Sequence, residues 1–278
     1  MITTTTVTVN NYRLRVLESG EGIPVLLLHG FGVNADDWRP TMELLQHQGY
    51  HAIAIDALGF GASDKPDGPV YSLQLYADLT AGVLDTLGVE RAVVVGHSMG
   101  GKLAISLTLN YPERVTRLLL ADSEGFMQIP MMMRKGGSIP FLGKLMFAFS
   151  SNPTLIRMQL AAAFYNPDQF VTPELVARGL TVMADPGIQR AMLNLSRYYE
   201  ANDLESTGLR ARLREITCPT LIVWGEHDRM FAASCGEAAR REIPGAHLVV
   251  IPRCGHFPQL EAFRAFHGLL MGFLAREA

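Results

Sequence analysis

Short, continuous apolar runs alternate with helix-like stretches along most of this chain, and this alternation constrains its fold more than any other feature. The runs lie at residues 24–30, 51–56, 91–96, 115–122, 219–225 and 246–252. Runs of this kind are typical of strands that are buried on both faces. Stretches with helical spacing lie at 38–48, 73–87, 99–110, 234–243 and 258–275. The pattern predicts an α/β fold, in which helices cover both faces of a mostly parallel sheet.

Two further segments precede the first apolar run. Residues 4–10 and 12–17 alternate apolar and polar side chains around Asn10-Asn11, which predicts an antiparallel hairpin. Together with the buried runs, the hairpin gives eight strands. The carboxyl ends of the parallel strands should share one edge of the sheet, where such sheets bind their ligands.

The alternation stops between Phe126 and Arg212. Helical patterns there are interrupted by prolines and glycines, and no buried-strand run occurs. We expect a helical insertion at 126–212, called the lid segment below, with 1–125 and 213–278 forming the core. The lid segment holds eight of the 13 methionines and several aromatic residues. Since methionine is flexible and polarizable, the segment favours an adaptable apolar surface; the alternative is that these side chains only pack the lid onto the sheet.

The composition excludes several classes of function. Lys and Arg number 24 against 27 Asp and Glu, and no basic run occurs, which argues against a nucleic-acid partner. The three cysteines form no CxxC motif, so neither a disulfide framework nor a structural zinc site is indicated. The first residues do not resemble a signal peptide, and no apolar run approaches the roughly 18 residues of a membrane span. We expect a cytoplasmic protein without a membrane partner; the sequence leaves its oligomeric state open.

The strongest local motif is Gly96-His97-Ser98-Met99-Gly100. It directly follows one buried run and opens a helical stretch, which is the context of a nucleophile elbow. Glycines leave room for the tight turn, and the start of a helix favours developing negative charge. The motif predicts that Ser98 is a nucleophile; the alternative is a structural serine in a tight turn.

A serine hydroxyl needs a base, and the base needs a carboxylate that orients it. His256 follows the last buried run, in Gly255-His256-Phe257-Pro258, and is the candidate base. Asp228 follows the preceding run and is the candidate acid. Asp122 ends another run and is a rival at the same edge. We favour Asp228 because its loop immediately precedes the strand that carries the histidine.

Hydrolysis through an acyl-enzyme also needs donors for an oxyanion. Glycines around Phe31 let the backbone approach a substrate, so the amides of Phe31 and Met99 are the candidate donors. We expect His29 to hold this loop by hydrogen bonds. The expected pocket lining is His29, Gly30, Met127, Met230 and Phe257. The sequence indicates neither a metal site nor an organic cofactor.

Five segments in this order resemble the α/β-hydrolase superfamily over essentially the whole chain. They begin at His29 (His-Gly-Phe-Gly), Asp56 (Asp-Ala-Leu-Gly-Phe-Gly-Ala-Ser), Gly96 (Gly-His-Ser-Met-Gly-Gly), Gly225 (Gly-Glu-His-Asp) and Gly255 (Gly-His-Phe-Pro). The resemblance implies an eight-stranded sheet with a lid after the sixth strand. It also implies Ser98, Asp228 and His256 as catalytic triad, with Phe31 and Met99 as oxyanion donors.

Within that superfamily the chain looks like a lid-bearing bacterial carboxylesterase, a branch that also contains carbon–carbon bond hydrolases, lactonases and perhydrolases. The carbon–carbon hydrolases typically carry Asn before the serine and a lid arginine that grips a carboxylate; here His97 departs from that pattern. The lid arginines are Arg134, Arg157, Arg178, Arg190 and Arg197. We expect hydrolysis of small to medium, largely apolar esters. The alternatives are carbon–carbon, lactone or perhydrolase chemistry, and, in a different class, a receptor with little turnover.

Overall fold

The structure is a computed structural model, and it describes residues 1–127 and 152–275. Part of the predicted lid surface lies outside these residues, namely Met131, Met132, Met133, Met146, Phe141, Phe147, Phe149 and Arg134.

Eight strands form one sheet in the order β1-β2-β4-β3-β5-β6-β7-β8. The strands are β1 (Thr3–Val9), β2 (Tyr12–Ser19), β3 (Ile23–Leu28), β4 (Tyr50–Ile55), β5 (Ala92–His97), β6 (Val115–Ala121), β7 (Thr220–Gly225) and β8 (His247–Ile251). β2 runs antiparallel to both of its neighbours, β1 and β4, and the remaining pairs are parallel. The predicted N-terminal hairpin and the mostly parallel sheet are both confirmed.

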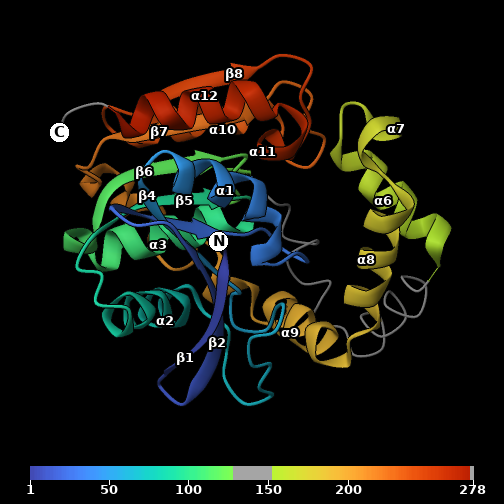
Figure 1. Cartoon of the computed structure of the whole chain (residues 1–278), viewed down its shortest axis with the longest axis horizontal. Coiled ribbons are helices and arrows are strands. Elements are labelled where there is room, and N and C mark those ends of the chain that lie inside the picture. The colour runs from blue at the N-terminus through green and yellow to red at the C-terminus, as the bar shows by residue number, and fades with distance from the viewer. Residues whose placement is uncertain (128–151, 276–278) are drawn as a thin grey trace.

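Helices cover both faces of this sheet (Figure 1). α1 (Arg39–His47) and α12 (Phe263–Leu274) pack on one face, whereas α2 (Leu73–Thr86), α3 (Met99–Asn110) and α10 (Ala233–Glu242) pack on the other. Successive side chains of a strand point to opposite faces, so a strand between two helical layers must be apolar throughout. Accordingly Leu26 and Leu28 belong to one core, and Val25 and Leu27 to the other.

The helix predicted at 258–275 is two helices in the structure. α11 (Pro258–Glu261) ends before Ala262, and α12 begins at Phe263. Glu261 is the last residue of α11. Its carboxylate accepts hydrogen bonds from the backbone N–H groups of Asn166 (2.8 Å) and Gly255. Helical periodicity could not reveal the break, because both helices share one apolar pattern.

The insertion between β6 and β7 is helical, as predicted, although its exact limits at 126 and 212 remain a prediction. It contains α6 (Pro153–Ala163), α7 (Pro167–Phe170), α8 (Pro173–Ala184) and α9 (Pro186–Arg197). α6, α7 and α8 stand to one side of the sheet in Figure 1. Each of these helices begins with a proline, a residue favoured at the first helical position. Within the parts of the chain that the structure describes, no helix is long and apolar enough to cross a membrane.

Candidate active site

Ser98 lies in a sharp turn between β5 and α3. Its backbone has φ 54° and ψ −121°, a rare conformation for a residue other than glycine. The flanking glycines make the turn possible: a Cβ on Gly96 would collide with the carbonyl of Gly100, and one on Gly100 with that of Leu28. The N–H of Ser98 donates to the carbonyl of Ala121 in β6 (3.0 Å). The turn therefore fixes Ser98 at the carboxyl edge of the sheet.

Ser98 lines a cavity of about 430 Å³ between this edge and the insertion. The insertion contributes mainly apolar groups, from Ile156, Leu160, Ala163, Gly179, Val182 and Met183, together with Gln159. The core contributes the loop at 30–33, the turn at 97–98, and segments that follow β6, β7 and β8. Among the lining residues that the structure describes, the titratable side chains are those of His97, Glu124 and His256, so this wall carries no lysine or arginine.

His256 and Asp228 form a buried pair beside this cavity. Nδ1 of His256 donates to Oδ2 of Asp228 over 2.8 Å, and His256 lines the same cavity as Ser98. Oδ1 of Asp228 accepts the N–H groups of Met230 (2.7 Å) and Phe231 (3.0 Å). Burial alone would raise the pKa of Asp228, but the hydrogen bond and positive charge of His256, with the backbone donor, lower it. Asp228 is therefore held as a carboxylate that can stabilise a histidine cation.

Asp122, the rival acid, makes a different set of contacts. Its side chain is fully buried, and its Oδ1 accepts the N–H of Gly225 over 2.9 Å. The hydrogen bond to Nδ1 of His256 belongs to Asp228. This geometry agrees with our preference for Asp228 as the orienting carboxylate and leaves Asp122 without an assigned task.

The two candidate oxyanion donors flank the serine. Met99 is the first residue of α3, and the first N–H groups of a helix have no partner within it. Phe31 lines the cavity, and its loop runs close to the nucleophile, because a Cβ on Gly30 would lie 3.2 Å from Cβ of Ser98. Both amides therefore belong to the backbone that surrounds the serine.

His97, which departs from the pattern of the carbon–carbon hydrolases, lines the cavity. Its Nε2–H donates to the carbonyl of His256 over 2.6 Å. Burial, aided by the nearby His256, lowers the pKa of His97 to about 3, so this ring is neutral. His97 is thus a neutral side chain whose hydrogen bond holds the loop that carries the candidate base.

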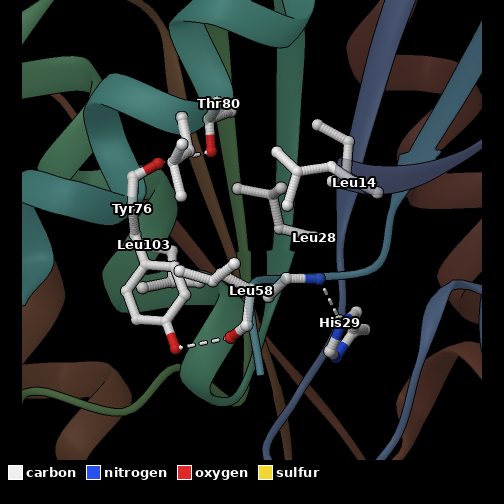
Figure 2. A pocket seen from close by; sticks show the side chains of 10 residues that line it. Leu14, Leu28, His29, Leu58, Tyr76, Thr80 and Leu103 are labelled. Atoms are coloured by element: carbon white, nitrogen blue, oxygen red, sulfur yellow. Dashed lines mark hydrogen bonds between the residues drawn. The ribbon is translucent and has the colours of Figure 1, made fainter. Parts of the chain in front are cut away.

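His29 lies behind the active-site loop and does not line the cavity, which corrects its place in the predicted pocket. Its Nδ1–H donates to the carbonyl of Gly30 (2.7 Å), and its Nε2 accepts the N–H of Ala57 (3.0 Å). Figure 2 shows this ring at the edge of a small apolar void, beside Leu28 and Leu58. That void measures about 10 Å³, the space of one water molecule at most, so it holds no substrate.

The other predicted pocket residues divide in two. Gly30, Met230 and Phe257 line the cavity. Met127 instead borders a separate small void beside Leu204, so its predicted place is also corrected. The reason is topological: Met127 follows the β6 edge by six residues, and the chain has already turned away from the serine.

Five core residues of the lining were missed in the sequence, namely Gly32, Val33, His97, Glu124 and Phe231. Glu124 is ion-paired with Lys102 of α3 over 2.7 Å, and its N–H donates to the carbonyl of Ser98 (3.0 Å). The edge rule for parallel sheets would have found Glu124, because it lies just beyond β6. The lining residues of α6 and α8 carried no such signal.

One group of side chains has the spacing of a metal site. Ligand atoms of Asp122, Asp228 and His256 lie within 4.8 Å of one another, and all three residues are buried. Asp228 and His256 are already hydrogen-bonded to each other, so an ion would have to break that bond. The set fits a proton-sharing network better than a cation.

Comparisons with known proteins agree with this fold. A family described as the alpha/beta hydrolase fold matches residues 23–263. The 2-hydroxymuconate semialdehyde hydrolase of Pseudomonas putida is 34% identical over 270 residues, which are 95% of this chain and 91% of that protein.

Two solved structures extend the comparison. A meta-cleavage product hydrolase from Pseudomonas fluorescens is 28% identical, with a TM-score of 0.83 over 97% of both chains. A structure described as an N-acyl homoserine lactone degrading enzyme is 31% identical, with a TM-score of 0.76 over 97% of this chain and 100% of that one.

Proposed function

The chain belongs to the α/β-hydrolase family, and from that premise we propose that it hydrolyses a carbon–carbon bond next to a ketone in a ring-cleavage product of the 2-hydroxy-6-oxo acid class. One observation carries the proposal: relatives that bear such names match nearly the whole chain, and Ser98 and His256 line one cavity in it. The sequence alone favoured a carboxylesterase, and that activity becomes the second candidate.

In the proposed reaction, His256 takes the hydroxyl proton while Oγ of Ser98 bonds to the ketone carbon. The amides of Phe31 and Met99 hold the oxyanion. The substrate reacts as its 2-oxo tautomer, in which the 2-hydroxyl proton has moved to the carbon next to the ketone. When the carbon–carbon bond breaks, its electron pair is therefore delocalised onto the 2-oxo oxygen. The leaving carbon takes the proton back from His256. Water, with His256 as base, hydrolyses the acyl-enzyme, while Asp228 stabilises the cationic ring.

Such a substrate also carries a carboxylate, which needs a cation. We assign this role to Arg178 of α8, because Gly179 and Val182 of the same helix line the cavity. The guanidinium of Arg178 is ion-paired over 2.8 Å with Asp37, whose side chain is 5% exposed. Asp37 would hold the arginine at the rim of the cavity until a substrate carboxylate arrives.

Ester hydrolysis is the second candidate, and the character of the cavity favours it. The described wall is largely apolar and carries no lysine or arginine, which suits a neutral ester. The same triad chemistry cleaves esters and lactones, and a relative is described as acting on a lactone.

A panel of substrates separates these candidates. We would compare kcat/KM for 2-hydroxy-6-oxo-6-phenylhexa-2,4-dienoate, p-nitrophenyl esters of increasing chain length and a γ-lactone. The carbon–carbon proposal expects the dienoate to exceed every ester by at least about tenfold, a difference of roughly 1.4 kcal/mol in transition-state binding. A reversed order would make the protein an esterase. Capture of one equivalent of ester without turnover would instead indicate a receptor.

A further inference from the structure

Asp122 is a buried carboxyl group to which the proposed reaction gives no task. It follows β6 with φ 42°, a backbone conformation that is costly outside glycine, so the fold holds it in place. Its N–H donates to the carbonyl of Val223 (3.0 Å), and its Oδ1 accepts the N–H of Gly225 (2.9 Å). Its Oδ2 is buried and receives no hydrogen bond from any described donor. A buried carboxyl oxygen that has no hydrogen-bond partner, in a side chain held in one place, needs an explanation; we call it the orphan oxygen.

The explanation lies in its neighbour, Asp228. Carboxylate oxygens of the two residues and a ring nitrogen of His256 lie within 4.8 Å of one another. Asp228 is ionised, because it accepts hydrogen bonds from Nδ1 of His256 and from two backbone N–H groups. Two buried carboxyl groups at this separation cannot both be ionised. Burial, and then the negative charge of Asp228, raise the pKa of Asp122 well above its usual value.

We propose that Asp122 is a positioning residue that stays protonated at neutral pH and donates a hydrogen bond from Oδ2–H to the carboxylate of Asp228. This bond gives the orphan oxygen a partner. A carboxylate offers about four lone-pair sites, and the three known bonds to Asp228 leave one for this donor. Asp122 then fixes Asp228 against His256 without placing a second negative charge beside the candidate base.

Other titratable groups face the same cluster. They are His97 from β5, Glu124 after β6, Glu261 from α11, and the Cys254 thiol after β8. Variants of Asp122 keep all four side chains, so the comparison of two such variants is made against the same set of neighbours.

The first test uses the pH dependence of serine labelling by a fluorophosphonate, which does not depend on knowing the substrate. Asp122→Asn keeps an acceptor for Gly225 and a donor for Asp228. The midpoint of the acidic limb, where the labelling rate falls with pH, should therefore stay within about 0.3 pH unit of wild type. Asp122→Leu removes the donor, which leaves Asp228 more basic, and should raise the limb by roughly 0.5 unit. Ser123→Ala changes the same turn without a titratable group and should leave the limb unmoved.

If Asp122 were ionised, Asp122→Asn would remove a charge about 5 Å from His256 and lower the limb by at least about one unit. That result would overturn the proposal. The proposal would also be overturned if the acidic limbs of Asp122→Asn and Asp122→Leu coincided. A residue with only a structural role would give no difference between these two variants.

The second test needs no activity and decides the question even if Asp122→Leu does not fold. A native carboxyl with a raised pKa keeps a proton that the unfolded chain releases above about pH 4, so the contribution of Asp122 to wild-type stability falls as pH rises. Asp122→Asn lacks this proton. Its free energy of unfolding, measured in urea, should therefore increase steadily relative to that of wild type between pH 4.5 and 8. A constant difference across that range would contradict a protonated Asp122.

Discussion

The backbone N–H of His256 donates to the carbonyl of Ala163, the last residue of α6, over 2.7 Å. The neighbouring rings continue this contact: Phe257 stacks on Phe164 with centroids 5.2 Å apart, and His97 lies 4.9 Å from the ring of His256. The insertion thus does more than cover the cavity, because it also fixes the loop that carries the candidate base.

Replacing Phe164 by alanine should loosen this loop. The stacked ring contributes about 0.5–1.5 kcal/mol beyond its buried area, so we expect kcat/KM to fall roughly three- to tenfold. Hydrogen exchange of the peptide that contains His256 should become faster, because its N–H would lose protection. Tyr198→Ala removes an exposed aromatic ring of the insertion and serves as the control. If hydrogen exchange of this peptide is unchanged in Phe164→Ala, the insertion does not fix the loop that carries His256.

Replacing Ser98 by alanine tests the nucleophile. If Ser98 forms the acyl-enzyme, kcat should fall by about 10⁶ for both the dienoate and the ester, because His256 and Asp228 act through the serine. Ser196→Ala, at an exposed serine of α9, should retain wild-type rates. Substantial turnover by Ser98→Ala would remove the covalent step from the mechanism.

Replacing Asp228 by asparagine tests the acid. The amide can hold the ring of His256 in the wrong tautomer, and the cationic ring loses its counter-charge, so we expect a loss of about 10⁴ in kcat. Purified protein should keep its circular dichroism spectrum, since the amide oxygen can still accept the N–H groups of Met230 and Phe231. A larger loss in Asp122→Asn than in Asp228→Asn would reverse the assignment.

The sheet and the serine turn could be predicted because they depend on local patterns. Continuous apolar runs mark strands between two helical layers, and Gly96 and Gly100 are required by collisions that any other residue would cause. The placement of Ser98, Asp228 and His256 just after β5, β7 and β8 followed from the common edge of parallel strands.

The lining of the cavity could not be predicted in the same way. It depends on how α6 and α8 are placed against the sheet edge, and amphipathic periodicity does not fix that placement. His97 shows the difference: its position next to Ser98 was plain, yet its contact with the carbonyl of His256 joins residues 159 positions apart in the sequence. The prediction that Met127 lines the cavity was wrong for the converse reason. Although Met127 is close to β6 in sequence, it borders a separate void.

His97 should make the folded state sensitive to acid. The unfolded chain protonates this histidine below about pH 6.5, whereas in the native state its pKa is lowered to about 3, so stability falls as pH decreases through that window. Urea unfolding at pH 7.5 and pH 4.5 should show a smaller loss of stability for His97→Asn than for wild type. His47→Asn, at an exposed histidine, should behave as wild type. Equal losses in all three proteins would mean that His97 is charged in the native state.

Arg178 should distinguish anionic from neutral substrates. A hydrogen bond to a charged group contributes about 1.5–3 kcal/mol, so Arg178→Met should raise KM for the dienoate at least about tenfold. The kcat/KM for a neutral p-nitrophenyl ester should change by less than about twofold. Arg190→Met is the matched control. Arg190 lies in the same insertion, but it pairs with the exposed Asp67.

The ion pair with Asp37 supplies a second comparison. Burial raises the pKa of Asp37, and Arg178 opposes this shift, so Arg178→Met also leaves a buried carboxyl group without its partner. Arg178→Lys keeps the positive charge and should recover part of the affinity for the dienoate. If both variants lose stability but bind the dienoate as wild type does, Arg178 only fastens α8 to the core. The apolar cavity would then favour a neutral ester as the substrate.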